Sequence, residues 1–140
     1  MGAVLALDYG TKRVGVAVTD SDRRYVFPRD TLTRTTPEDD LAALRAIVGD
    51  DGVDLMVVGV PFNADGTEGP MAKTAREWGG KLAEALGLPC EWVDERYTSQ
   101  EAEEGLRETY PKNTRKRRML RDRAAAVLIL KTWMEHGPCD

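Results

Sequence analysis

The sequence is poor in the residues that mark several protein classes. Its two cysteines, Cys90 and Cys139, have no metal-binding spacing and form no disulfide framework. Its single histidine, His136, lies near the C-terminus without a partner in the sequence, and we assign it no role. No apolar run reaches the length of a membrane span, and the N-terminus lacks the layout of a signal peptide. These absences indicate a soluble cytoplasmic protein without a membrane partner.

The remaining composition is that of an ordinary globular protein. The chain has 140 residues, of which 41% are hydrophobic and 31% are charged. This length suffices for one domain with a substantial core, and no repeat or linker divides the chain. We therefore expect a single domain over residues 1–140.

The net charge of −4 hides an uneven distribution. Residues 112–123, KNTRKRRMLRDR, contain seven basic side chains and one acid, so this segment carries +6 and the rest of the chain −10. Because local patches bind phosphate backbones whatever the total charge, the segment predicts a nucleic-acid partner. Its candidate contacts are Lys112, Arg115, Lys116, Arg117 and Arg118.

The order of the predicted elements indicates the fold class. Residues 3–8 and 13–20 are apolar segments joined by a tight turn and predict a hairpin, and residues 23–30 predict a short third strand. Later strands at 53–60 and 89–95 are separated by a helix, which favours parallel pairing. We expect an α/β protein with a mixed five-stranded sheet, three antiparallel strands and then two parallel ones, flanked by helices. This is the order of the RNase H-like fold.

Two predicted helices precede the last strand. Thr36 is a helix N-cap, and helical spacing then continues to about Gly49. A second helix is predicted from Met71 to Leu86, with Trp78 on its apolar face. The pair Gly79–Gly80 inside it predicts a close packing contact, because each glycine otherwise weakens a helix by about 1 kcal/mol.

Two further helices are expected in the C-terminal part. Thr98 and Glu101 form a capping box that predicts a helix start. The basic segment is expected to be a loop, followed by a last helix that begins at Asp122 and places Trp133 in the core.

Three carboxylates follow strands or open a helix: Asp8, Glu95 and Asp122. Sites in open α/β sheets form outside the carboxyl ends of strands, and three alanines after Asp122 allow its helix to approach the sheet. Carboxylates that meet repel one another unless cations lie between them, and Mg²⁺ or Mn²⁺ ions suit oxygen ligands. Two such ions about 4 Å apart hydrolyse phosphodiesters. We therefore predict two ions per active site, held by the three catalytic carboxylates.

Each carboxylate also has an ordinary structural interpretation. Asp8 precedes a turn, Glu95 is able to pair with Arg96, and Asp122 would gain about 0.5 kcal/mol from a helix dipole. Taken singly, these interpretations are the stronger ones. The joint placement of the three acids beside a dense basic segment favours the metal site.

Other polar residues near these acids have two interpretations each. Lys12 and Arg13 follow the hairpin turn and either hold a phosphate or are solvated charges. Arg96 either neutralises charge in the transition state or orients its neighbouring glutamate. The loop after the buried strand either has a function or is an ordinary turn; its polar residues are Asn63, Asp65 and Thr67.

Four ordered segments of the chain resemble the YqgF/RuvX family of pre-16S rRNA nucleases, which are related to the RuvC-type Holliday-junction resolvases. LALDYGTKRVGVAVTD is similar to the family's opening strand, and VVGVPFNADGTEGP to its glycine-rich loop. VDERYTSQEAE and DRAAAVLIL resemble its Asp-Glu-Arg segment and its terminal helix. The resemblance covers almost the whole chain and implies an RNase H-like fold. It also implies that Asp8, Glu95 and Asp122 are the catalytic metal ligands.

The resemblance leaves the substrate open between structured RNA and branched DNA. The first expectation is metal-dependent hydrolysis that processes the 5′ end of pre-16S rRNA. The alternative is a resolvase that cuts four-way DNA junctions, which requires a homodimer because resolution needs two symmetric cuts.

Two further classes are less consistent with the sequence. An actin-like phosphate-binding module is suggested by DYGTK, but such proteins need two large lobes and 140 residues supply one. A nucleic-acid-binding protein without catalysis would use the basic segment alone, and three acids near phosphate would then only weaken binding.

Overall fold

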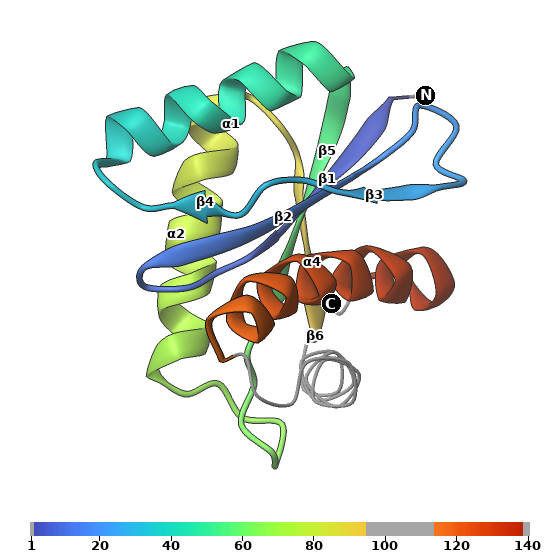
Figure 1. The fold of residues 1–140 in the computed structure, drawn as a ribbon. Coiled ribbons are helices and arrows are strands. Elements are labelled where there is room, and N and C mark those ends of the chain that lie inside the picture. The colour runs from blue at the N-terminus through green and yellow to red at the C-terminus, as the bar shows by residue number, and fades with distance from the viewer. Residues whose placement is uncertain (1, 95–113, 139–140) are drawn as a thin grey trace.

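The computed structural model describes residues 2–94 and 114–138, with the backbone alone over 114–123. Within these ranges, three helices pack against one six-stranded sheet (Figure 1). The strands are β1 Ala3–Asp8, β2 Arg13–Thr19, β3 Val26–Pro28, β4 Leu32–Thr33, β5 Val53–Val60 and β6 Cys90–Asp94. The helices are α1 Pro37–Asp51, α2 Pro70–Leu86 and α4 Thr114–His136.

The sheet has the mixed order that the sequence predicts. Its strands run β3-β2-β1-β5-β6, with antiparallel pairing on the β2 side of β1 and parallel pairing on the β5 side. The short strand β4 pairs with the start of β2 and adds a strand to the five expected. Two residues are too few to give a periodic pattern, so β4 has no signal in the sequence.

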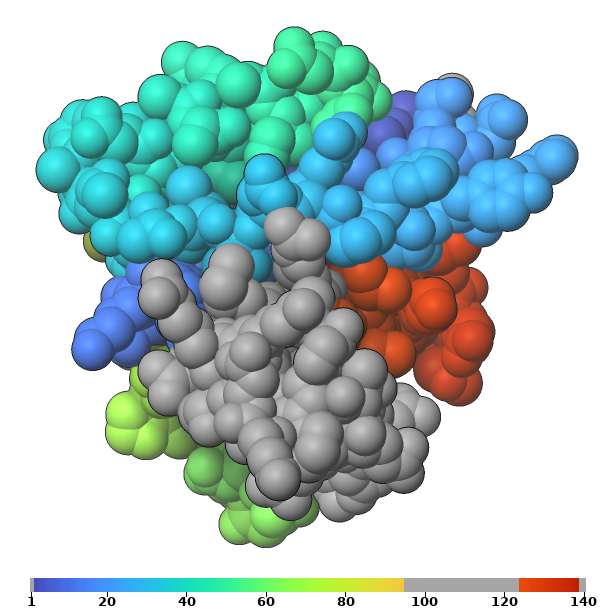
Figure 2. All heavy atoms as spheres, viewed as in Figure 1, coloured from blue at the N-terminus to red at the C-terminus, as the bar shows by residue number. Residues whose placement is uncertain are grey.

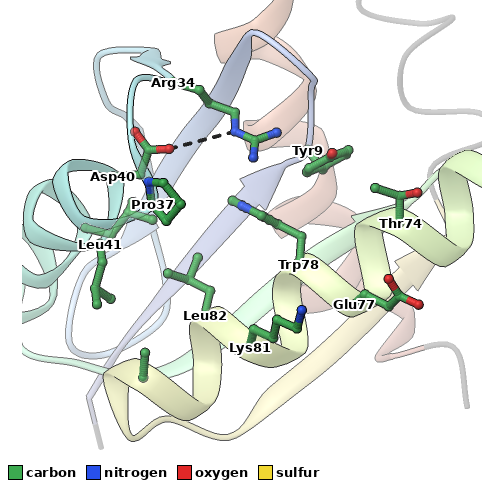
Figure 3. Close-up of a pocket in the computed structure, with 12 residues that line it drawn as sticks. Tyr9, Arg34, Pro37, Asp40, Leu41, Thr74, Glu77, Trp78, Lys81 and Leu82 are labelled. Atoms are coloured by element: carbon green, nitrogen blue, oxygen red, sulfur yellow. Dashed lines mark ion pairs between the residues drawn. The ribbon is translucent and has the colours of Figure 1, made fainter.

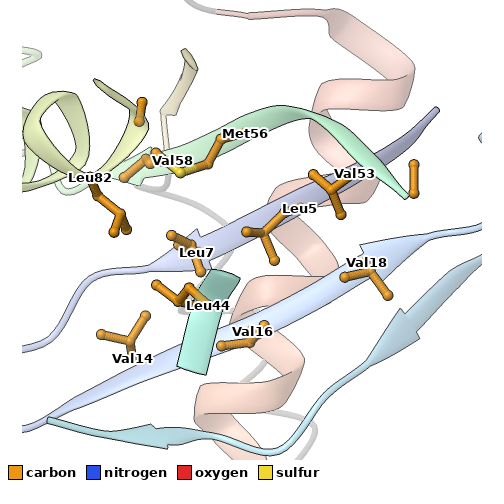
Figure 4. Packing of buried hydrophobic residues seen from close by; sticks show 12 residues of the cluster. Leu5, Leu7, Val14, Val16, Val18, Leu44, Val53, Met56, Val58 and Leu82 are labelled. Atoms are coloured by element: carbon orange, nitrogen blue, oxygen red, sulfur yellow. The ribbon is translucent and has the colours of Figure 1, made fainter. Parts of the chain in front are cut away.

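Two apolar cores lie on opposite faces of the sheet. Leu5, Leu7, Val16 and Met56 pack toward α1 and α2, as Figure 4 shows. The residues that alternate with them along the strands pack toward α4. The helices on the two faces together cover the apolar side chains of both faces of the sheet. This burial of apolar surface is the main stabilising contribution to the fold.

The predicted start of α1 and end of α2 are confirmed, whereas α1 continues to Asp51, two residues beyond the end expected near Gly49. The Thr36 side chain accepts a hydrogen bond from the Asp39 N–H, and α1 ends at Gly52 in the left-handed conformation, with φ 66°. Gly87, with φ 71°, ends α2 in the same way. Left-handed backbone favours glycine because a Cβ atom would be strained there.

The predicted start of the last helix is wrong. The chain is already helical at Thr114, so Arg115, Lys116, Arg117 and Arg118 lie in the first turns of α4 and form no loop. Asp122 consequently lies in the third turn, where the helix dipole no longer acts on it. Arginine and lysine are good helix formers, and their mutual repulsion does not outweigh that preference here.

None of the helices in the described part of the chain is long and apolar enough to cross a membrane.

Candidate active site

Asp8 is half-buried at the last position of β1. Leu5 and Leu7 face α1 and α2, whereas Val4 and Ala6 face α4. Because side chains alternate along a strand, position 8 falls on the α4 face.

Glycines flank Asp8 on both neighbouring strands. In the register of the sheet, Asp8 lies opposite Gly15 of β2 and opposite Gly59 of β5, and Gly59 lies opposite Val93 of β6. Both glycines are buried. The positions directly opposite Asp8 on the two neighbouring strands therefore carry no side chain, which suits a site that has to accept a cation or a phosphate. These two glycines have no functional signal in the sequence, because only strand pairing places them next to Asp8.

Position 122 of α4 lies on the helical stripe that faces the sheet. Ala126, Ile129 and Leu130 of α4 are buried in the core that includes Val4 and Ala6 of β1. Residue 122 precedes these positions by four, seven and eight residues, which is the spacing of one helical face. By helical spacing, position 122 therefore belongs to the stripe with which α4 packs on the face of the sheet that Asp8 shares.

Glu95 lies outside the described residues, as do Arg96 and Lys112. The end of β6 nevertheless shows on which face the neighbouring residue Asp94 lies. Val93 packs into the α4-side core, so alternation places Asp94 on the α1 and α2 face. Asp94 therefore lies on the sheet face opposite that of Asp8.

Lys12 and Arg13 lie at the hairpin, where β2 begins. Lys12 is exposed, and its carbonyl accepts a hydrogen bond of 2.9 Å from the Arg34 N–H. In Figure 2 the hairpin in blue and the loop after β5 in green are visible on the same face of the molecule as α4. This exposed placement suits a role in holding phosphate beside Asp8 and equally suits a solvated surface charge.

The polar residues of the loop after β5 bond to one another. The Asn63 side-chain amide donates to Thr67 Oγ1 at 3.0 Å, and the Thr67 hydroxyl donates to Asp65 Oδ1 at 2.6 Å. The Asp65 carboxylate also accepts from the Thr67 backbone N–H at 3.0 Å. These contacts close the loop on itself, so they support the turn interpretation of these residues.

A cavity of about 440 Å³ lies on the other face of the sheet, between α1 and α2 (Figure 3). Three of its lining residues are Tyr9, Arg34 and Trp78. Trp78 is half-buried and packs on the core, as expected, but it also lines this cavity. Tyr9, Arg34 and Trp78 come from three separate segments, and no spacing in the sequence connects them.

Covalent chemistry by a thiol is disfavoured within the described chain. Burial, with a smaller contribution from the neighbouring Glu91 charge, raises the pKa of the Cys90 thiol to about 11. A thiol with that pKa is almost entirely protonated at neutral pH, and the thiolate is the nucleophilic form.

The described residues contain no group of three metal-ligating side chains. Of the three predicted ligands, only Asp8 has a described side chain. Its carboxylate is a hard oxygen donor, the ligand type that Mg²⁺ and Mn²⁺ prefer.

The sheet order and the helices on its two faces define the RNase H-like fold class. Among solved structures, T. thermophilus RuvC in complex with a Holliday junction substrate matches with a TM-score of 0.54, covering 98% of this chain and 97% of that chain. The two sequences are 14% identical, so this likeness concerns the fold.

The sequence comparisons are more specific. The family model RuvX, described as Holliday junction resolvase, matches residues 2–136. A protein of Picosynechococcus sp. named "Putative pre-16S rRNA nuclease" is 42% identical over 137 residues, which cover 98% of this chain and 94% of the relative. A protein of the same name from Dechloromonas aromatica is 42% identical over 135 residues, 96% and 92% of the two chains. The chain belongs to the RuvX family.

Proposed function

We propose that this protein is a divalent-metal-dependent nuclease that processes the 5′ end of pre-16S rRNA. Its membership of the RuvX family and the name of its curated relatives support this activity. The structural observation that carries the proposal is the placement of Asp8, between two glycines and on the sheet face toward which the stripe of Asp122 is directed.

In this proposal Asp8, Glu95 and Asp122 hold two Mg²⁺ or Mn²⁺ ions. Such ions, when bound, activate a water molecule and stabilise the leaving oxygen of a phosphodiester. The protein's own residues position the substrate. Lys12, Arg13 and Arg96 hold the phosphate near the carboxylates, and a second set binds the backbone of the nucleic acid. That second set comprises Lys112, Arg115, Lys116, Arg117 and Arg118.

The test replaces Asp8 by asparagine, which keeps the shape of the side chain and removes its charge. Asp8→Asn should abolish cleavage and leave the thermal unfolding midpoint unchanged or slightly raised without metal, because carboxylate repulsion is relieved. Asp22→Asn is the matched control, because Asp22 is an exposed aspartate of the turn after β2. Cleavage by Asp8→Asn at the rate of the Asp22→Asn control would contradict the proposal.

A second candidate is the resolution of four-way DNA junctions. The family description as Holliday junction resolvase and the fold shared with a RuvC–junction complex favour it. Cleavage of a pre-16S leader RNA, linear duplex DNA and a four-way junction, each with and without Mn²⁺, separates the two candidates. Light scattering also measures whether the protein is a monomer or a dimer under cleavage conditions. A junction resolvase has to be a dimer, because it makes paired cuts.

A further inference from the structure

The cavity between α1 and α2 has no part in the hydrolysis proposed above. Its volume of about 440 Å³ lies in the range of small-ligand sites. Half of its twelve lining residues are apolar side chains of the two helices, and Figure 3 shows one of them, Trp78, directed from α2 toward the start of α1. The other apolar lining residues are Pro37, Leu41, Leu44, Leu82 and Ala85.

Tyr9 connects this cavity to the candidate active site, because it directly follows Asp8. The rings of Tyr9 and Trp78 have centroids 5.1 Å apart and an interplanar angle of 53°. The guanidinium carbon of Arg34 lies 5.2 Å from the Tyr9 centroid and 5.9 Å from the Trp78 centroid. The cavity therefore has an aromatic wall at the end of the strand that presents Asp8.

The aromatic wall is held in place by the residues around it. Arg34 Nη1 donates to the Gly10 carbonyl at 3.1 Å, and its Nε lies 3.8 Å from the Asp40 carboxylate. Asp40 is only 8% exposed and accepts a hydrogen bond from the Thr35 N–H at 3.1 Å. These contacts fix the guanidinium over the rings, so the site is formed before a ligand enters it.

The charges that line the cavity favour a neutral ligand. Arg34 is paired with Asp40, and α2 contributes one cation and one acid, Lys81 and Glu77. Because the signs balance, the cavity has no excess positive charge for a phosphate. A planar ring whose edge carries both donors and acceptors matches the aromatic wall and the polar groups of α2.

We infer that this cavity takes an unpaired nucleobase of the strand whose phosphate lies at Asp8. Because β1 ends at Asp8, a strand of nucleic acid at this edge can place a phosphate on one face of the sheet and a neighbouring base on the other. Stacking on aromatic side chains is tolerant of base identity, so the site anchors a single-stranded segment without reading its sequence. The inference rests on the proposed function, since it requires nucleic acid at Asp8.

The test measures RNA binding in the Asp8→Asn background, which is expected to bind without cutting. A set of leader RNAs, each with one abasic position near the cleavage point, is titrated against this protein and against the same protein with Trp78→Leu. One abasic position should weaken binding about tenfold in the first protein and have no effect in the second, where the stacking partner is already missing. Trp133→Leu, on the α4 side of the sheet, is the matched control and should retain the abasic effect.

A cavity-filling variant provides a second test in case Trp78→Leu does not fold. Ala85 is exposed on α2 and lines the cavity, so Ala85→Trp should fill it while leaving the aromatic wall intact. It should weaken binding of the intact RNA about tenfold and remove the abasic effect.

Binding of the free mononucleotides AMP and UMP is measured as well, because a free nucleotide has the same planar base as a nucleotide within RNA. They should bind more weakly than the RNA, and tighter binding would assign the cavity to a free nucleotide and overturn the inference. The inference would also be overturned if RNA binds but neither Trp78→Leu nor Ala85→Trp changes the effect of an abasic position. That result would leave the proposed nuclease function unaffected. Absence of any RNA binding would contradict the proposed function itself.

Discussion

At the scale of single residues, Arg23 combines an unfavourable backbone conformation with favourable side-chain contacts. Among the described residues it is the one non-glycine residue with positive φ, at 58°. Its Nε donates to the Gly2 carbonyl at 2.8 Å, and its Nη2 donates to Asp54 at 2.7 Å. Its guanidinium also lies 5.8 Å from the centroid of the Trp133 ring. The side chain thus joins the start of β1, the start of β5 and α4.

Two substitutions separate these effects. Arg23→Ala should lower the free energy of unfolding by about 1–2 kcal/mol, because it removes the contacts and leaves the strain of a Cβ atom in left-handed backbone unchanged. Arg23→Gly should be more stable than Arg23→Ala by about 1 kcal/mol, because glycine adopts this backbone without strain. Urea unfolding measures both, and equal stability of the two variants would show that the backbone is not strained.

At the scale of elements, the glycine pair of α2 shows how a helix fits its sheet. A Cβ atom on Gly79 would lie 3.1 Å from Trp92 Cζ3 of β6 and 3.2 Å from Val58 Cγ2 of β5. A Cβ atom on Gly80 would meet nothing within 4 Å. The close contact expected from the sequence is therefore confirmed for the first glycine only, since the second points away from the sheet.

Adjacent alanine substitutions should have opposite outcomes. Gly80→Ala should raise the free energy of unfolding by about 0.5–1 kcal/mol, because helix propensity improves at no steric cost. Gly79→Ala should give no gain or a loss, because Trp92 and Val58 have to move by a few tenths of an ångström. Urea denaturation of the two variants in parallel checks this, and an equal gain at both positions would contradict the tight packing of α2 on the sheet.

At the scale of the whole molecule, α4 covers one face of the sheet and begins with the basic segment. In a helix, consecutive residues point in different directions, so Arg115, Lys116, Arg117 and Arg118 should contribute unequally to binding one strand of nucleic acid. Positions 115 and 118 repeat at helical spacing with Asp122, whereas positions 116 and 117 lie on other sides of the helix.

Paired substitutions test which side of α4 meets the substrate. Arg115→Ala with Arg118→Ala should lower the slope of log affinity against log salt by about 1.4 on single-stranded RNA, at about 0.7 per phosphate contact. The double variant Lys116→Ala with Arg117→Ala removes the same charge from the other sides of α4. It should lower the salt slope by less. Fluorescence titration between 50 and 200 mM salt, about the range over which such contacts are screened, measures both slopes. Equal slopes would mean that total charge, not helix orientation, governs binding.

Local patterns in the sequence determined most of the elements. Alternation and apolar runs predicted β1, β2, β5 and β6, and the cap residues Thr36 and Gly87 marked one end each of α1 and α2, because these signals act between near neighbours in the chain. The family was also recognisable from four motifs, and the family model confirms it. The assignments of Asp8, Glu95 and Asp122 as metal ligands remain predictions.

Only the tertiary structure decided features that join distant segments. Pairing of β1 with β2 and β5 places Gly15 and Gly59 beside Asp8, and packing of α1 against α2 forms the cavity at Trp78. The early start of α4 is a further case, because neighbouring positive charges favour a loop in the sequence while helix propensity and packing of the later turns on the sheet favour a helix. Local signals specified which segments are helices and strands; the site depends on contacts across the sheet, which no spacing along the chain encodes.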